Sequence, residues 1–166
     1  RARAKEILFE YNNLHPSEME KRTEILKHFL GATGKQLLIE QPFRCDYGYN
    51  IRVGENFYAN MGCTILDEAL VTFGDNVLLA PNVSIYTAGH AVNVAQRIVG
   101  WEYAYPVTVG HNVWIGGNVV ILPGVSIGDN SIIGGGSVVT KDIPANVIAV
   151  GNPCKVIREL TEDELK

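Results

Sequence analysis

The sequence predicts a mainly β protein: a parallel β-helix that follows an N-terminal helical hairpin and ends in a short C-terminal helix. Three observations support this fold class. Aliphatic residues recur every six positions through much of the chain, small or turn-tolerant residues follow each of them, and only the first thirty residues have helical periodicity. A fixed period over most of a chain indicates stacked repeats, and α-helical spacing does not produce a period of six.

Residues 1–31 are expected to form an N-terminal helical segment. Apolar residues share one face of each of its two helices: Ala4, Ile7, Leu8 and Tyr11 in the first, and Ile25, Leu26, Phe29 and Leu30 in the second. Ser17 and Glu20 have the spacing of a capping box. Gly31 is suited to a left-handed C-cap that ends the second helix.

Residues 32–160 are expected to form the β-helix, and 161–166 a C-terminal tail. The strictest repeat comprises Val109, Ile115, Ile121, Ile127, Ile133 and Val139. The corners after its strands are Gly110-His111-Asn112, Gly116-Gly117-Asn118, Gly128-Asp129-Asn130 and Gly134-Gly135-Gly136. Two earlier groups keep the register, with two extra residues between them: Val53, Ala59 and Ile65, then Phe73, Leu79 and Ile85. Each six-residue unit therefore predicts a short strand and a corner, with the aliphatic side chain inside.

The repeat breaks between Ile85 and Val107. Positions 91, 97 and 103 should be aliphatic but are Ala, Arg and Tyr, and the phase resumes unchanged at Val107. Residues from about 87 to 105 are therefore expected to leave the coil as a loop. Rigid scaffolds often present functional groups on such loops, and this one contains His90.

Composition limits the classes of function. The 14 Lys and Arg against 18 Asp and Glu give a formal charge of −4, which argues against a nucleic-acid partner. Three cysteines with no CxxC spacing indicate neither a disulfide framework nor a zinc knuckle. No apolar run is long enough for a membrane span and no signal peptide opens the sequence, so we expect a cytoplasmic protein with no membrane partner.

Several motifs resemble the hexapeptide-repeat sugar O-acetyltransferases, most closely the maltose acetyltransferases and next the galactoside-type enzymes. They are YNNLHPSEMEKR (11–22), FRCDYGYNI (43–51), NFYANMGCTILD (56–67), LAPNVSIYTAGH (79–90), PVTVGHNVWIGGNVVILPGVSIGDNSIIGGGSVVTKDIP (106–144) and GNPCKVIREL (151–160). The resemblance implies a left-handed coil and a homotrimer. It also implies that acetyl-CoA and a small sugar acceptor bind between neighbouring subunits.

The resemblance places the catalytic histidine at His90. Transfer of an acetyl group from a thioester to a hydroxyl needs a general base, and imidazole is partly neutral at cellular pH. Asp46, Asn60 and Glu68 match acceptor-binding positions, where carboxylates and amides can bond to sugar hydroxyls. Glu68 replaces the aspartate of the galactoside-type enzymes, and Asp67 is its spare candidate.

The family pattern also gives a set of cofactor-binding positions: Trp114, Gly117, Gly135, Thr140, Lys141, Lys155 and Arg158. At the two glycines the missing side chains would let backbone amides approach the pantetheine. Lys155 and Arg158 would lie near the nucleotide phosphates. Trp101, Glu102 and Tyr103 in the loop are candidates to border the sugar or to orient His90.

Other readings remain open. A galactoside or other xenobiotic acceptor would change only the substrate, whereas a non-catalytic β-helical scaffold would bind no CoA. A nucleophilic Cys63 or Cys154 would have to lie near His90 as a thiolate. A three-histidine metal site, as in hexapeptide-repeat carbonic anhydrases, is not expected, because only His90 and His111 fall among the repeats.

Overall fold

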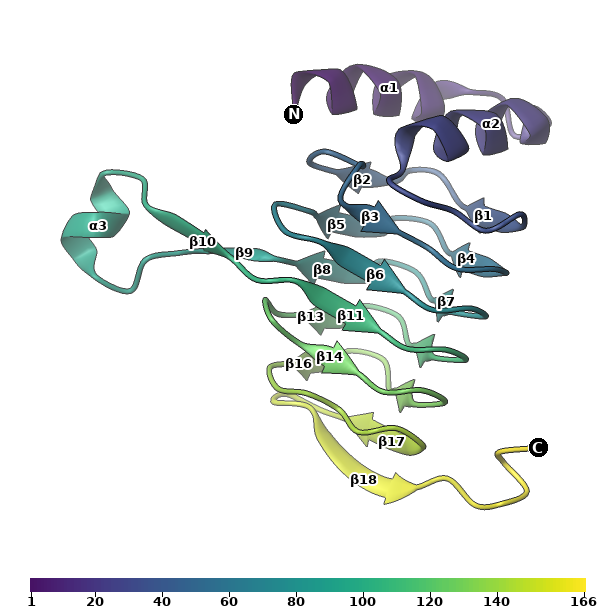
Figure 1. Cartoon of the computed structure of the whole chain (residues 1–166), viewed down its shortest axis with the longest axis vertical. Helices are drawn as coiled ribbons and strands as arrows, with labels where there is room; N and C mark the ends of the chain where they lie inside the picture. Colours follow the sequence, from purple (N-terminus) through teal and green to yellow (C-terminus); the bar gives the residue numbers. More distant parts are fainter.

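A computed structural model describes all residues, 1–166, and shows a stack of β coils covered at one end by two helices (Figure 1). The helices are α1 (Ala2–Asn13) and α2 (Met19–Phe29). Their buried faces hold Ala4, Leu8 and Leu26, as the apolar spacing predicts. No helix of the chain is long and apolar enough to cross a membrane.

The predicted caps of α2 are wrong. Glu18, not Ser17, is the N-cap residue, and it makes no side-chain cap hydrogen bond. The Ser17 hydroxyl instead lies 2.8 Å from Nδ1 of His15. Leu30, in an extended conformation, ends the helix. Gly31 has no positive φ; it is needed because a Cβ there would overlap the carbonyl oxygen of Tyr49.

The coils form three sheets, whose strands are parallel except for the last strand of the seven-stranded sheet. The four-stranded sheet contains β3 (Ile51–Arg52), β6 (Val71–Phe73), β11 (Val107–Val109) and β14 (Ser126–Ile127). The seven-stranded sheet contains β1 (Leu37–Ile39), β4 (Phe57–Ala59), β7 (Leu78–Leu79), β12 (Trp114–Ile115), β15 (Ile132–Ile133), β17 (Val147–Val150) and β18 (Lys155–Glu159). The five-stranded sheet contains β2 (Arg44–Cys45), β5 (Thr64–Leu66), β8 (Ser84–Tyr86), β13 (Val120–Ile121) and β16 (Val138–Val139). In Figure 1 the near strands run right and the far strands run left while the chain descends, so the coils wind left-handedly.

The six-residue repeat forms the interior of the stack. Ile121 pairs in register with Ile85 above it and Val139 below it, and all three are completely buried. The other repeat positions lie in the same way on the remaining sheets. The residue two positions earlier is buried as well, as Val119 is beside Ile121, because side chains alternate along a strand.

Three edges join the sheets, and we name them by their contents. The hairpin edge, from the five-stranded to the four-stranded sheet, comprises residues 46–50, 67–70, 87–106, 122–125 and 140–142. The glycine edge, from the seven-stranded to the five-stranded sheet, comprises 40–43, 60–63, 80–83, 116–119 and 134–137. The asparagine edge, from the four-stranded to the seven-stranded sheet, comprises 53–56, 74–77, 110–113, 128–131 and 144–146.

A ladder of amide side chains runs along the asparagine edge. Its members, all with φ between 53° and 61°, are Asn56, Asn76, Asn112, Asn130 and Asn146. Each side chain donates to the next at 2.7 to 2.9 Å. The successive members are 20, 36, 18 and 16 residues apart in the sequence. Coils of different length therefore keep the same register at this edge.

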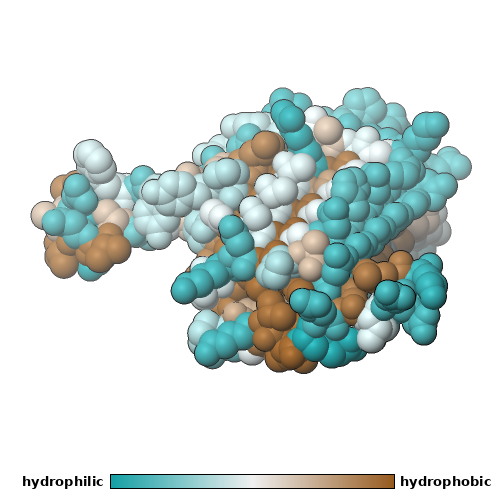
Figure 2. All heavy atoms as spheres, turned by 60° about the horizontal axis from the view of Figure 1, so that its bottom comes forward, coloured by the Kyte–Doolittle hydropathy of each residue, from teal (hydrophilic) through white to brown (hydrophobic).

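The predicted loop is a hairpin that projects from the hairpin edge (Figure 1). It consists of β9 (Ala88–His90), α3 (Val94–Ile98) and β10 (Glu102–Ala104), and β9 and β10 pair antiparallel. The Tyr105 N–H donates to the Thr87 carbonyl at 2.8 Å and closes its base. Apolar side chains are exposed at its tip (Figure 2), Val92 most of all at 90%.

The expected short C-terminal helix is absent. Lys155–Glu159 forms β18 instead, which pairs antiparallel with β17. Without this partner, β17 would be a free edge with unpaired backbone groups. The Leu160 N–H then donates to the Asn146 carbonyl at 2.8 Å, and the last residues form a turn around Thr161 and Glu164.

Candidate active site

The hairpin brings His90 opposite a carboxylate. His90 and Glu102 are cross-strand partners in β9 and β10, and Nδ1 of His90 lies 3.7 Å from Oε1 of Glu102. The imidazole is 60% exposed, so an external substrate can reach it.

Two further carboxylates lie on the same edge. Asp46 follows β2 and Glu68 follows β5, which are neighbouring strands of the five-stranded sheet. Arg1 at the start of α1 bonds to both: its Nε lies 3.4 Å from Oδ1 of Asp46, and its Nη2 pairs with Oε1 of Glu68. Sequence spacing gives no sign of this role for Arg1, because the contact depends on how α1 covers the stack.

The Glu68 carboxyl is electrostatically unusual. Burial raises its pKa above the ordinary value, and the nearby carboxyl of Asp46 raises it further. Its Oε2 is buried and has no hydrogen-bond partner. A buried acceptor without a hydrogen-bond partner destabilises the folded chain. This oxygen is therefore suited to accept a hydrogen bond from a hydroxyl group of a ligand.

Asp67 and Asn60 have roles in corners. Asp67 is completely buried, and its carboxylate accepts the backbone N–H groups of Asp46, Tyr47 and Gly48 at 2.8 to 3.0 Å. Asp67 therefore has a structural role, and the prediction that it could bind the acceptor in place of Glu68 is wrong. Asn60 lies on the glycine edge, where its Oδ1 accepts the N–H of Met61 at 2.8 Å and leaves the amide Nδ2 free.

The glycine edge exposes backbone. Gly117 and Gly135 occupy equivalent corners of successive coils, and the Gly135 corner lies directly beside the Gly117 carbonyl. An added Cβ would lie 3.4 Å from the Pro81 carbonyl oxygen at Gly117, which is ordinary contact, and 3.2 Å from the Gly117 carbonyl oxygen at Gly135, which is tight. What both glycines provide is a strip of accessible amide backbone that an extended polar chain can approach.

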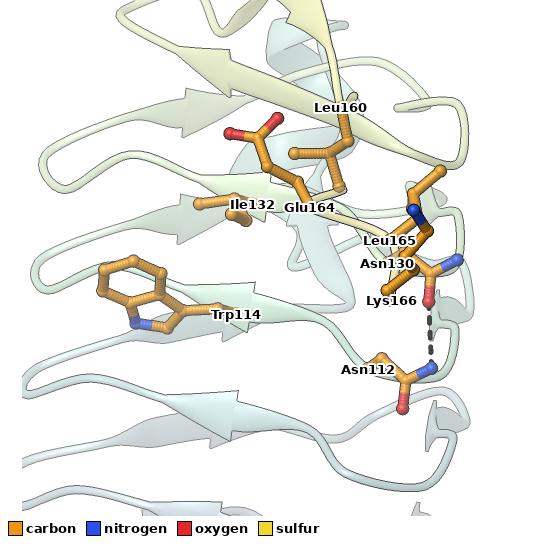
Figure 3. A pocket seen from close by; sticks show the side chains of 8 residues that line it. All are labelled: Asn112, Trp114, Asn130, Ile132, Leu160, Glu164, Leu165 and Lys166. Atoms are coloured by element: carbon orange, nitrogen blue, oxygen red, sulfur yellow. Dashed lines mark hydrogen bonds between the residues drawn. The ribbon is translucent and has the colours of Figure 1, made fainter. Parts of the chain in front are cut away.

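A pocket lies beside Trp114, on the outer face of the seven-stranded sheet. Figure 3 shows the residues that line this cavity of about 570 Å³: Asn112, Trp114, Asn130, Ile132, Leu160, Glu164, Leu165 and Lys166. Trp114 is half exposed within it. Lys155 and Arg158 lie on β18 at the end of the same sheet, whereas Thr140 and Lys141 follow β16 on the hairpin edge.

The candidate residues thus fall on two different edges of one chain. Asp46, Glu68 and His90 share the hairpin edge, while Asn60 and Gly117 lie on the glycine edge. The five-stranded sheet separates these edges. A single chain does not gather all the candidates into one site.

The site is not extended by Cys63, Cys154 or His111. Cys63 is buried, and burial raises the pKa of its thiol to about 11. Burial also raises the pKa of Cys154. Nδ1 of His111 accepts the N–H of Asp75 at 2.9 Å in the asparagine edge. No three His, Cys, Asp or Glu side chains are grouped so that they could hold a metal ion.

Comparison with known proteins agrees with this geometry. Residues 1–34 match the model of the maltose acetyltransferase hexapeptide capping motif, and 106–141 match the bacterial transferase hexapeptide with six repeats. Both matches assign the fold to the hexapeptide-repeat transferases.

Three individual relatives are acetyltransferases that act on sugars, by their names. The galactoside O-acetyltransferase of Escherichia coli is 52% identical over 98% of this chain and 80% of its own. A maltose O-acetyltransferase structure from Clostridium difficile is 56% identical, with a TM-score of 0.96 over 98% of this chain and 87% of that one. A galactoside acetyltransferase in complex with coenzyme A is 52% identical, with a TM-score of 0.97 over 99% and 82%. The chain belongs to this family of O-acetyltransferases, and it is an enzyme.

Proposed function

We propose that the protein transfers an acetyl group from acetyl-CoA to a hydroxyl of a small sugar of the maltose or glucose type. The observation that carries this proposal is the hairpin edge, where an exposed histidine stands beside a carboxylate and two further carboxylates lie on neighbouring coils. Carboxylates that accept several hydroxyl hydrogen bonds are suited to a polyol. The match to the maltose acetyltransferase capping motif supports the maltose type, and the galactoside relatives make a galactoside the second candidate acceptor.

His90 acts as the general base. It takes the proton of the acceptor hydroxyl as the oxygen attacks the thioester carbonyl, and the C–S bond then breaks. The proton passes from the imidazolium to the leaving thiolate, so the histidine is regenerated without an acyl-enzyme. Glu102 stabilises the imidazolium between these two proton transfers. The raised thiol pKa values of Cys63 and Cys154 support this path over a cysteine nucleophile.

The acyl donor would lie along the glycine edge and end at β18. Gly117 and Gly135 offer backbone amides to its pantetheine, and Trp114 offers an apolar face. Thr140 and Lys141 lie on the hairpin edge, so they would border this track from the neighbouring subunit. Lys155 and Arg158 are cations for its phosphates. These features fit an extended, amide-containing chain with an anionic nucleotide at one end.

The working form is a homotrimer. In a ring of three chains, the hairpin edge of one subunit can face the glycine edge of the next, so that both sets of residues contribute to one site. The three free cysteines support the reducing cytoplasm as its compartment.

The test is thiol release from acetyl-CoA with maltose, glucose, a thiogalactoside and chloramphenicol as acceptors. His90→Ala should lower acceptor-dependent release by about 10²- to 10⁴-fold, the usual contribution of a general base. His111→Ala is the matched control, because that histidine is similarly exposed but lies on another edge. Release that is equal in wild type and His90→Ala would overturn the base assignment. No release with any of these acceptors would overturn the assignment of a maltose, glucose or galactoside acceptor.

A further inference from the structure

The C-terminal turn fixes the guanidinium of Arg158. Its Nη1 and Nη2 donate to the two carboxylate oxygens of Glu164, each at 2.7 Å, and Nη1 also donates to the Glu159 carbonyl at 3.0 Å. The Thr161 N–H and hydroxyl donate to Oε2 of Glu164 at 2.9 and 3.1 Å. These donors hold the pKa of Glu164 at about 2, Arg158 first among them, so the carboxylate is ionised at any working pH.

This arrangement leaves one part of the guanidinium unused. Of its five N–H groups, both on Nη1 and one on Nη2 have partners. The remaining Nη2–H and the Nε–H lie side by side and parallel, on the edge of the guanidinium that Glu164 does not touch. Two parallel N–H groups form the fork that binds phosphate through two hydrogen bonds.

We propose that Glu164 is a positioning residue for the nucleotide end of the acyl donor: it holds Arg158 so that the free Nε and Nη2 fork receives a phosphate. The inference rests on the proposed function, in which Arg158 binds a phosphate of acetyl-CoA. Glu164 also lines the Trp114 pocket (Figure 3), so the turn that fixes Arg158 borders the same cavity.

Charge alone predicts the opposite effect. Glu164→Gln removes a negative charge beside a phosphate site, so electrostatic attraction would strengthen binding of an anion. A loss of affinity in this variant would therefore run against the charge effect, as expected if Glu164 orients Arg158. A weaker affinity for the anion would identify Glu164 as a positioning residue, whereas a stronger affinity would show that its carboxylate competes with the phosphate.

The experiment compares KM and kcat for acetyl-CoA and for S-acetyl-pantetheine, which has no phosphate. Glu164→Gln should raise the KM for acetyl-CoA about 3- to 10-fold with kcat unchanged, the cost of replacing a two-bond charged contact by a loosely held one. The KM for S-acetyl-pantetheine should not change. Glu162→Gln, in the same exposed tail, is the matched control and should leave both values unchanged.

Two further measurements make the result specific. In an Arg158→Ala background, Glu164→Gln should have no additional effect on KM. Adenosine 3′,5′-bisphosphate binding, measured by calorimetry, should weaken in Glu164→Gln without any need for acetyl transfer. An unchanged or lowered KM, an equal loss with the phosphate-free donor, or an equal loss without Arg158 would each overturn the inference. If the wild type bound neither acetyl-CoA nor the bisphosphate, the proposed function would itself fail.

Discussion

At the scale of single residues, Asp67 and Glu68 show how one step along the chain changes a carboxylate's role. The Asp67 side chain points into the stack and ties the 46–48 corner, whereas Glu68 points toward Arg1 and Asp46. The resemblance to sugar acetyltransferases predicted that Glu68 binds the acceptor, with Asp67 as the alternative. Only the structure separates the two, because the corner between β5 and β6 follows no fixed repeat.

Glu68 makes stability depend on pH. Its pKa in the folded chain lies above the ordinary value of 4.5, so the folded state binds the proton more tightly than the unfolded state does. This carboxyl therefore favours folding most at low pH, and that contribution is lost as the pH rises from 4.5 through the native pKa. Glu68→Gln should abolish this slope.

The measurement is the free energy of unfolding in urea, from about pH 4 to about pH 7, for wild type and Glu68→Gln. Wild type should lose stability relative to the variant as the pH rises. Glu162→Gln serves as the exposed control and should run parallel to wild type. A wild type that gains stability relative to Glu68→Gln over this range would show that Arg1 lowers the Glu68 pKa instead.

At the scale of elements, the hairpin was predictable because an interruption is easy to see against a strict period. Positions 91, 97 and 103 lack the large aliphatic residue that the repeat requires, and this located the hairpin to within a few residues. Its internal structure was not predictable, since β9, α3 and β10 are short and bury no side chain in the core. The caps of α2 were missed for a related reason: the contacts of Gly31 with the 48–51 backbone, rather than local propensity, end that helix.

The hairpin should be separable from the stack. Replacing residues 88–104 by two glycines joins Thr87 to Tyr105, whose backbones are already hydrogen-bonded. No buried residue is removed, so we expect the thermal midpoint to stay within about 5 °C of wild type, with an unchanged circular dichroism spectrum. Acetyl transfer should fall at least as far as in His90→Ala. A variant that does not fold would show that the hairpin stabilises the coils.

At the scale of the whole molecule, the candidate site is divided between two edges. The six-residue period predicted the stack and its core, and the resemblance of the motifs to sugar acetyltransferases predicted the site residues. Neither could show that Asp46 and His90 lie on one edge while Gly117 lies on another, because that depends on which corner each repeat occupies. The prediction of a C-terminal helix was wrong for a comparable reason. The backbone groups of β17 need a hydrogen-bonded partner strand, and this outweighs the local helical propensity of the C-terminal residues.

The divided site predicts complementation between inactive chains. His90→Ala disables the hairpin edge and Gly117→Trp obstructs the glycine edge, and each variant alone should be inactive. In trimers assembled from an equal mixture, some interfaces pair an intact hairpin edge with an intact glycine edge. Random assembly should restore roughly a quarter of the wild-type activity per site.

A matched mixture tests the assignment of edges. His90→Ala and Asp46→Ala lie on the same edge, so their mixture should recover nothing. Light scattering on the same samples checks for three chains per particle. Mixed trimers of His90→Ala and Gly117→Trp that stay inactive would place the whole site within one subunit.

The amide ladder on the asparagine edge shows where the fold can tolerate coils of different length. Its members are separated by 16 to 36 residues, yet each rung has nearly the same length. The differences in coil length fall on the hairpin edge, whose corners range from three to twenty residues (140–142 to 87–106). A segment of different length inserted at the hairpin edge should therefore leave the amide ladder and the pairing of the coils unchanged.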